Sequence, residues 1–396
     1  MLCSEARLRR LLLERREQDA LDVGAPPPDV QQAPVCLPQF VERTPMLVIT
    51  FTAFKAHGSI PRSDEAKRLG LRIAFDKHSG HIAVFISHRW WQAHSVQGFD
   101  AGCPDYTEGE KANLKWRVIV LGVEALIKRR SLDADKTVLW IDWTCIDQDD
   151  VDERGRGVQS LIHWTTQCAF MLIPTQHDAS QWVGVMDTLA ILSPGDLPDY
   201  GPRGWCRLEW FIFTLWAAIQ GVDDLQLYAV NLVGDLNDYP EVYVGDENEL
   251  PDRGILSVET DRSSIRDLQM QMIEAFANAV VDNLKRSRGW FDLGGKLLGD
   301  EHMLQVVRAV EELQPTALHI QGNPRITAAG YGQLFGCLAT ANSLKVLQVG
   351  VGSAHSDRRG RLRLGANAAL GASGNFDAQV AAQLIAALKT QTGLET

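Results

Sequence analysis

The chain has 396 residues, which is enough for about two or three domains, each with a hydrophobic core of its own. With 45% apolar and 22% charged residues, its composition is typical of a globular protein that folds over most of its length. Its 39 basic and 50 acidic residues give a formal net charge of −11, which argues against nucleic acid as the main ligand.

The sequence also argues against a membrane partner. The longest apolar run, 210–219, is about half as long as a membrane span, and the N-terminus lacks the pattern of a secretory signal. We therefore expect a cytoplasmic protein. The seven cysteines are scattered and none is spaced like a zinc ligand, so neither a disulfide framework nor a metal site is indicated.

Residues 1–45 are expected to form an N-terminal appendage. Residues 5–20 have the composition of a charged, solvated helix. Three consecutive prolines at 26–28 end this helix and begin a linker.

An α/β domain is predicted over residues 46–235. Short β-rich runs alternate there with helical patterns, and such alternation is typical of a parallel sheet covered by helices on both faces. The β-rich runs lie at 46–51, 82–87, 137–141, 169–174 and 225–230, and the helical patterns at 111–128, 158–167 and from 205 onward. In such sheets ligands bind at the carboxyl ends of the strands, and polar and aromatic residues follow three of them, at 87–91, 142–148 and 175–177.

The helix that begins at Trp205 is apolar almost all the way round, and Glu209 interrupts it. At 100° per residue, Glu209 shares a face with Trp205, Phe213 and Trp216. Because a buried carboxylate is costly, we expect either an ion pair with an arginine or a raised pKa and a chemical role. Arg203, Arg207 and a distant arginine such as Arg89 are the candidate partners.

Three segments resemble known families. Residues 83–90 (AVFISHRW) look like the first strand of Toll/interleukin-1 receptor (TIR) domains, and residues 203–209 (RGWCRLE) resemble the Trp-Cys-x-x-Glu motif of their third helix. Residues 139–148 (LWIDWTCIDQ) resemble the Trp-Ile-Asp-x-x-Cys-Ile-x-Gln signature of the fungal heterokaryon-incompatibility (HET) domains, which are themselves TIR-like. The resemblance implies a flavodoxin-like fold and, as in many TIR-like domains, cleavage of the nicotinamide N-glycosidic bond of NAD.

Carried across, the glutamate of the Trp-Cys-x-x-Glu motif is Glu209, which the resemblance makes the catalytic residue. A carboxylate in a dry pocket can stabilise the oxocarbenium-like state that forms when an N-glycosidic bond breaks. Trp90 and Trp205 can stack on a planar base, and Arg89 can hold a pyrophosphate. NAD is thus the expected substrate, and no further cofactor is implied.

Two further residues, Ser87 and Asp142, complete the predicted substrate-binding set because they end or follow adjacent parallel strands. Each of these assignments has a structural alternative. Trp90 and Trp205 are equally compatible with a core position, Arg89 with an ion pair to Glu209 or Asp142, and Ser87 with a simple strand end.

One departure from animal TIR domains is an acidic loop at 147–153 in place of their Arg-Asp-x-x-Pro-Gly loop, which argues against receptor-type docking. This loop does not match a calcium-binding EF-hand, because its fifth position is Val151 and its sixth lacks glycine.

Residues 236–300 are predicted to be a loop and a helical connector, the helix running from Asp261 or Ser263 to a stop near Gly289. Residues 301–396 contain an internal repeat with an offset of 50 residues, in which Leu334 and Leu338 recur as Leu384 and Leu388. Together with 318–323 and 344–349, this segment resembles ribonuclease-inhibitor-type leucine-rich repeats, and two units make the array short or incomplete.

Two functions from different classes follow. The first is a TIR-like effector of immunity or cell death that cleaves NAD. The second is a catalytically silent TIR-like scaffold that signals by self-association, with the leucine-rich repeat as a sensor or as the site for a protein partner.

Overall fold

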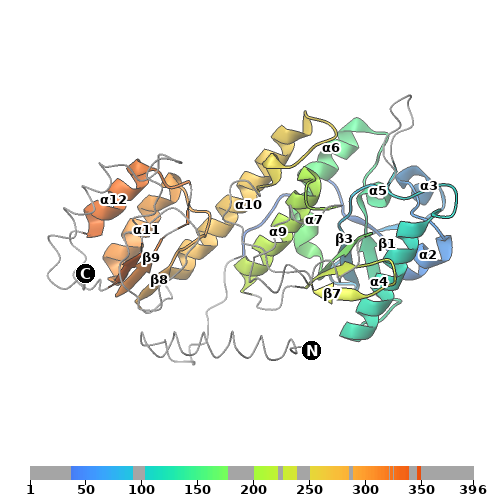
Figure 1. Cartoon of the computed structure of the whole chain (residues 1–396), viewed down its shortest axis with the longest axis horizontal. Coiled ribbons are helices and arrows are strands. Elements are labelled where there is room, and N and C mark those ends of the chain that lie inside the picture. The colour runs from blue at the N-terminus through green and yellow to red at the C-terminus, as the bar shows by residue number, and fades with distance from the viewer. Residues whose placement is uncertain are drawn as a thin grey trace.

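The structure is a computed structural model that describes residues 37–91, 103–176, 200–221, 226–238, 250–284, 289–320, 322–323, 325–338 and 346–348. The helix predicted over 5–20 and the repeated positions Leu384 and Leu388 lie outside these residues. Within the described part, two sheets are connected by one long helix (Figure 1).

The larger sheet has seven strands in the order β2-β1-β4-β3-β5-β6-β7. Its centre is parallel, because β3 pairs in parallel with β4 and β5, and β5 with β6. The mainly parallel sheet predicted from the alternating pattern is thus confirmed. These strands are β1 (Leu47–Thr50), β2 (Arg72–Ala74), β3 (Ile82–Ile86), β4 (Thr137–Trp140), β5 (Phe170–Pro174), β6 (Leu227–Val230) and β7 (Leu236–Asp238).

The edges of this sheet are antiparallel. β1 runs antiparallel to both β2 and β4, and β7 runs antiparallel to β6. The strand predicted over 46–51 therefore belongs to the sheet but not to its parallel part. The chain turns at Gly58 and Gly70, both with positive φ, and returns as β2 after two short helices, α2 (Phe51–His57) and α3 (Ser63–Arg68).

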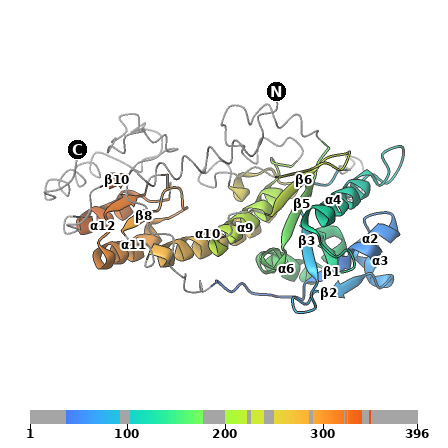
Figure 2. The ribbon, with the colours of Figure 1, turned by 90° about the horizontal axis from the view of Figure 1, so that it is seen from below.

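Helices cover both faces of the sheet (Figure 2). Side chains alternate along each strand, so that Phe85 and Trp140 face one core while Val84 and Leu139 face the other. The second core packs against α2 and α4 (Leu114–Arg130). The first core packs against α7 (Leu161–Gln167) and α9 (Gly204–Gln220), with α6 (Val151–Gln159) beside them.

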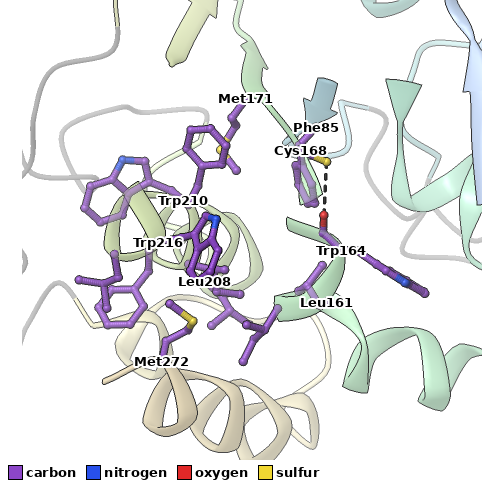
Figure 3. Close-up of a cluster of buried hydrophobic side chains, with 14 of the residues drawn as sticks. Phe85, Leu161, Trp164, Cys168, Met171, Leu208, Trp210, Trp216 and Met272 are labelled. Carbon is purple, nitrogen blue, oxygen red and sulfur yellow. Dashed lines mark hydrogen bonds between the residues drawn. The ribbon is translucent and has the colours of Figure 1, made fainter. Parts of the chain in front are cut away.

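Helix α9 is buried on nearly every side, as its apolar sequence predicts. Trp210, Trp216 and Leu208 pack in one cluster with Met171 of β5 and Met272 of the following helix (Figure 3). The first turn of α9 lies close to the segment that contains Pro251 and Leu256. A Cβ atom on Gly204 would lie 2.6 Å from Leu256 and 3.1 Å from the carbonyl oxygen of Pro251, so this position has no room for a side chain.

The helix predicted from Asp261 or Ser263 is α10 (Asp261–Leu284), and it follows a short 3-10 turn at Pro251–Arg253. Ile265 and Met272 in its first half belong to the core under α9, whereas Val281 and Leu284 near its end belong to the core of the smaller sheet. Helix α10 therefore both closes the first core and extends into the second.

The smaller sheet has the order β10-β9-β8 and is parallel throughout. Its strands are β8 (Trp290–Asp292), β9 (Ala317–His319) and β10 (Val346–Gln348), and its helices are α11 (Asp300–Leu313) and α12 (Ala328–Leu338). Strand β8 lies in the range assigned from the sequence to the connector, so this sheet begins before residue 301.

Candidate functional site

A cavity of about 780 Å³ opens at the carboxyl ends of β3 and β4. Its floor is formed by residues that follow these two strands, and its walls come from α6, α9 and α10. The cavity lies where ligands bind in parallel α/β sheets. Its lining includes His88, Arg89, Trp90, Asp142, Gln148, Arg154, Trp205, Cys206, Glu209, Asp261 and Gln271.

Glu209 reaches this cavity from the second turn of α9. Only 8% of the residue is exposed, and its carboxylate has no ion pair among the described residues. Its hydrogen-bond partner is instead Ser87, the residue that follows β3. The Ser87 hydroxyl donates to Glu209 Oε2 at 2.5 Å. The arginine partners considered from the sequence bind elsewhere: Arg207 Nε donates to the carbonyl of Gly201, and Arg203 donates to Ser257.

The surroundings favour the protonated form of Glu209. Burial raises the pKa of the Glu209 carboxyl well above its ordinary value, and the negative charge of Asp142 raises it further. The hydrogen bond from Ser87 acts in the opposite direction but is the smaller effect. A carboxyl with a raised pKa is thus held at the wall of the cavity, where an incoming positive charge would favour its ionised form.

Ser87 is itself fixed by a buried hydrogen-bond network. Its Oγ lies 2.6 Å from the hydroxyl of Tyr200, which donates to the carbonyl of Cys206 at 2.8 Å. Tyr200 therefore connects the end of β3 to the first turn of α9. This network holds the Ser87 hydroxyl in place against Glu209.

A second polar group on the cavity floor is Asp142, the first residue of α5 (Asp142–Cys145). Its Oδ1 accepts hydrogen bonds from His88 Nε2 at 3.0 Å and from the backbone N–H of Trp143 at 2.5 Å. Its side chain is one-third exposed. On the other side of His88, the buried ammonium of Lys115 lies 3.2 Å from Nδ1.

These contacts set the charges of the group. Burial lowers the pKa of His88, and the positive charge of Lys115 lowers it further, so the imidazole is neutral at neutral pH. Burial acts to raise the pKa of Asp142, but the charge interaction with His88 outweighs it together with the hydrogen bonds from His88 and Trp143 and the charge of Lys115, and the pKa is lowered. Asp142 is thus ionised.

Aromatic side chains form the cavity walls. Trp90 packs edge-on against Trp143, with ring centroids 5.0 Å apart. The guanidinium of Arg62 lies over the Trp143 ring, 5.6 Å from its centroid. Trp205 is half-buried, and its Nε1 donates to Asp261 Oδ2 at 3.0 Å, at the start of α10. Both indoles are held by neighbours and present ring surface to the cavity.

Arg89 is exposed at the cavity and makes no ion pair with Glu209 or Asp142. The site residues predicted from the sequence are therefore brought together. Five of them line the cavity, whereas Ser87 is not part of the lining and is hydrogen-bonded to Glu209. The five are Arg89, Trp90, Asp142, Trp205 and Glu209.

Sequence reasoning did not select His88, Lys115 or Tyr200 as site residues. The partners of His88 lie 27 and 54 residues away in the chain, so no local pattern connects them. A signal did exist for Lys115, which lies three and four residues before the buried Val118 and Ile119 and so shares their helical face.

The acidic loop after β4 has a structural explanation. Asp150 caps α6 by accepting from the N–H groups of Asp152 and Glu153, and Asp149 pairs with Arg62. Over the residues that the structure describes, no cluster of three or more His, Cys, Asp or Glu side chains is arranged to hold a metal ion.

Comparison with protein-family models, with curated proteins and with solved structures gave no match. Among the described helices, none combines the length and apolar character needed to cross a membrane.

Proposed function

We propose that this protein cleaves the nicotinamide N-glycosidic bond of NAD, with Glu209 as the catalytic residue. The observation that carries the proposal is Glu209 itself: a buried carboxyl with no ion pair to any residue that the structure describes, hydrogen-bonded to Ser87, at the wall of a large cavity beside the ionised Asp142. A carboxyl whose role was structural would be expected to have a cationic partner.

The charge of the substrate fits this site. The nicotinamide ring of NAD is cationic, and a positive charge near Glu209 favours its ionised form. Binding of this ring would thus convert Glu209 from a neutral acid to a carboxylate where it is needed. The reduced dinucleotide, whose ring is neutral, would lack this effect.

The reaction breaks the bond between ribose C1′ and the ring nitrogen, and nicotinamide leaves with the bonding electron pair. Glu209 would hold the ribose hydroxyls and stabilise the positive charge that develops on the sugar. Water then adds to C1′ and loses a proton, which gives the free sugar end. Trp90 and Trp205 would stack on the bases, and Arg89 would bind the pyrophosphate.

The strand order supports a flavodoxin-like, TIR-like architecture for the first part of the chain. Counted from β3, the parallel strands have the order 2-1-3-4, which is the start of the flavodoxin-like order 2-1-3-4-5. Helix α9, with the Trp-Cys-x-x-Glu motif, lies between the third and fourth of these strands, β5 and β6.

The smaller sheet supports a leucine-rich-repeat type for the second part. Trp290 pairs with Ala317 and Ala317 with Val346, a spacing of 27 and then 29 residues, close to a repeat unit of about 28 residues. Asn323 is buried, as in the asparagine position of such repeats. Its side chain accepts from the N–H groups of Lys296 and Leu298 and donates to the carbonyls of Leu293 and Ile320.

The test is to incubate the purified full-length protein with NAD and to measure released nicotinamide by chromatography. Glu209→Gln is the control, because it preserves shape and removes the ionisable group. Release by the wild type and its loss in the variant would support the proposal. No release from the wild type, or full release from the variant, would refute it.

A further inference from the structure

Lys115 is a charged side chain with no exposed surface. It enters the core from the first turn of α4, where the carboxylate of Asp105 accepts hydrogen bonds from the N–H groups of Lys115 and Trp116 at 2.9 and 2.7 Å. The backbone that carries Lys115 is therefore fixed.

The ammonium group of Lys115 is also held on several sides. It donates to the carbonyl of Arg89, lies 3.2 Å from His88 Nδ1, and lies 4.7 Å from the centre of the Trp91 ring. An ammonium group is only a donor, so Nδ1 of His88 must be the acceptor. The proton of the neutral imidazole is then on Nε2, the atom that faces Asp142.

Among the described residues, Asp142 is held at one oxygen only. Oδ1 accepts from both His88 Nε2 and the N–H of Trp143, while the side chain remains one-third exposed at the cavity. Among the described residues, three elements contribute titratable groups around His88: Lys115 on α4, Asp142 at the start of α5, and Glu209 on α9, which shares the cavity.

We propose that Lys115 and His88 are positioning residues that hold Asp142 as an ionised acceptor, with Oδ2 available to hydroxyl or amide N–H groups of the ligand. Lys115 fixes the Nε2–H tautomer of His88, and His88 fixes the carboxylate. Protonation of Nδ1 would require the loss of its contact with the ammonium group, so the arrangement resists acid.

The inference rests on the proposed function for the identity of the ligand, but its structural part has a readout that needs no activity. In the full-length protein labelled with ¹⁵N-histidine, the ring nitrogens of His88 report tautomer and protonation directly. We expect the Nε2–H tautomer and a pKa below the ordinary 6.5. Lys115→Met removes the charge at similar length, and its His88 should titrate at a higher pH.

The kinetic part uses the same variant. With Lys115→Met, kcat/KM for NAD should fall by about tenfold or more and should acquire a dependence on the titration of His88. His88→Gln can still donate to Asp142 and accept from Lys115, so it should stay within about tenfold of the wild type, whereas His88→Leu should lose about a hundredfold. Lys128→Met removes an exposed charge at the far end of the same helix and is the matched control.

The outcomes separate the two proposals. A wild-type His88 in the Nδ1–H form, or one that titrates at its ordinary pKa, overturns the positioning role whether or not NAD is cleaved. So does a folded Lys115→Met protein whose His88 is unchanged. The expected tautomer and titration in a protein that neither binds nor cleaves NAD would support the positioning role and refute the proposed function.

Discussion

The hydroxyl of Ser87 donates to Glu209 Oε2 at 2.5 Å across 122 residues of sequence, and this contact joins the end of β3 to α9. It places a buried carboxyl at the cavity with a neutral partner instead of a cationic one. Burial and then the charge of Asp142 raise the pKa of Glu209, and the hydrogen bond from Ser87 does not offset them as the charge of an arginine would.

Glu209→Gln should abolish nicotinamide release and leave the melting temperature unchanged or raised. The glutamine keeps the shape of the acid and removes a group that is costly to ionise in place, and relieving such a cost at a functional site is often stabilising. Thermal unfolding and nicotinamide release on the same preparation check both effects. If the carboxylate were instead half of a buried ion pair, the variant would lose about 3–5 kcal/mol and unfold several degrees earlier.

The stability difference between Glu209→Gln and the wild type should grow with pH. Because the folded pKa of Glu209 lies above its ordinary 4.5, the folded state holds this proton more tightly than the unfolded state does. Stability contributed by the protonated group is complete below about pH 4.5 and is lost as pH rises through the folded pKa. Urea unfolding at a series of pH values should show near-equal stability in acid and an increasing advantage of the variant at neutral and alkaline pH. A difference that stays constant with pH would mean that the pKa of Glu209 is the same in the folded and unfolded states.

Ser87→Ala should lower activity and raise the pKa of Glu209 further. The hydrogen bond from the Ser87 hydroxyl lowers the pKa of Glu209 and so favours its ionised form. Without it, nothing opposes the increase in this pKa that burial and the charge of Asp142 cause. We expect the acidic limb of the kcat profile to move to higher pH. Thr165→Val is the matched control, since it removes a fully buried hydroxyl that bonds within α7 to the carbonyl of Leu161. An equal effect of both variants would indicate general loss of packing.

Trp90→Leu should raise KM for NAD by about 5-fold to 150-fold with a smaller change in kcat, because stacking of a base on an aromatic ring contributes about 1–3 kcal/mol. Trp116→Leu is the control. Trp116 is also half-buried, but its Nε1 donates to the carbonyl of Phe54 and it belongs to the core on the other face of the sheet. An unchanged KM for Trp90→Leu would remove this indole from the binding site.

The sequence was informative where local periodicity determines which face of a helix or strand a residue occupies. Helical spacing predicted that Glu209 shares a face with Trp205, and strand alternation predicted the parallel sheet that brings Ser87 and Asp142 to one edge. Both residues do lie at that edge, beside Glu209. These are short-range patterns, and each is fixed by the geometry of one helix or strand.

Long-range partners were not accessible in this way. In the helix predicted over 111–128, the apolar Leu121 is 40% exposed, whereas the buried face of α4 contains Lys115. A lysine on an apolar face can be interpreted only with its acceptors known, and those of Lys115 come from the segment after β3. For the same reason the sequence suggested arginine partners for Glu209 and not Ser87.

Asn323→Ala should destabilise the smaller sheet and leave the cavity intact. Within the part of the chain that the structure describes, its side chain makes hydrogen bonds to Lys296, Leu298, Leu293 and Ile320, and their removal leaves these buried N–H and C=O groups without that partner. We expect a loss of about 2–4 kcal/mol, the sum of the lost bonds and of the groups left unsatisfied. Hydrogen exchange should show reduced protection in β8 and β9 and near-normal protection in β3 and β5.

Asn231→Ala is the matched control, because Asn231 is also buried but organises the turn between β6 and β7 through the N–H groups of Val233 and Asp235. Its effect should appear in the larger sheet. If Asn323→Ala instead lowered protection equally in both sheets, the two cores that α10 joins would unfold as one unit.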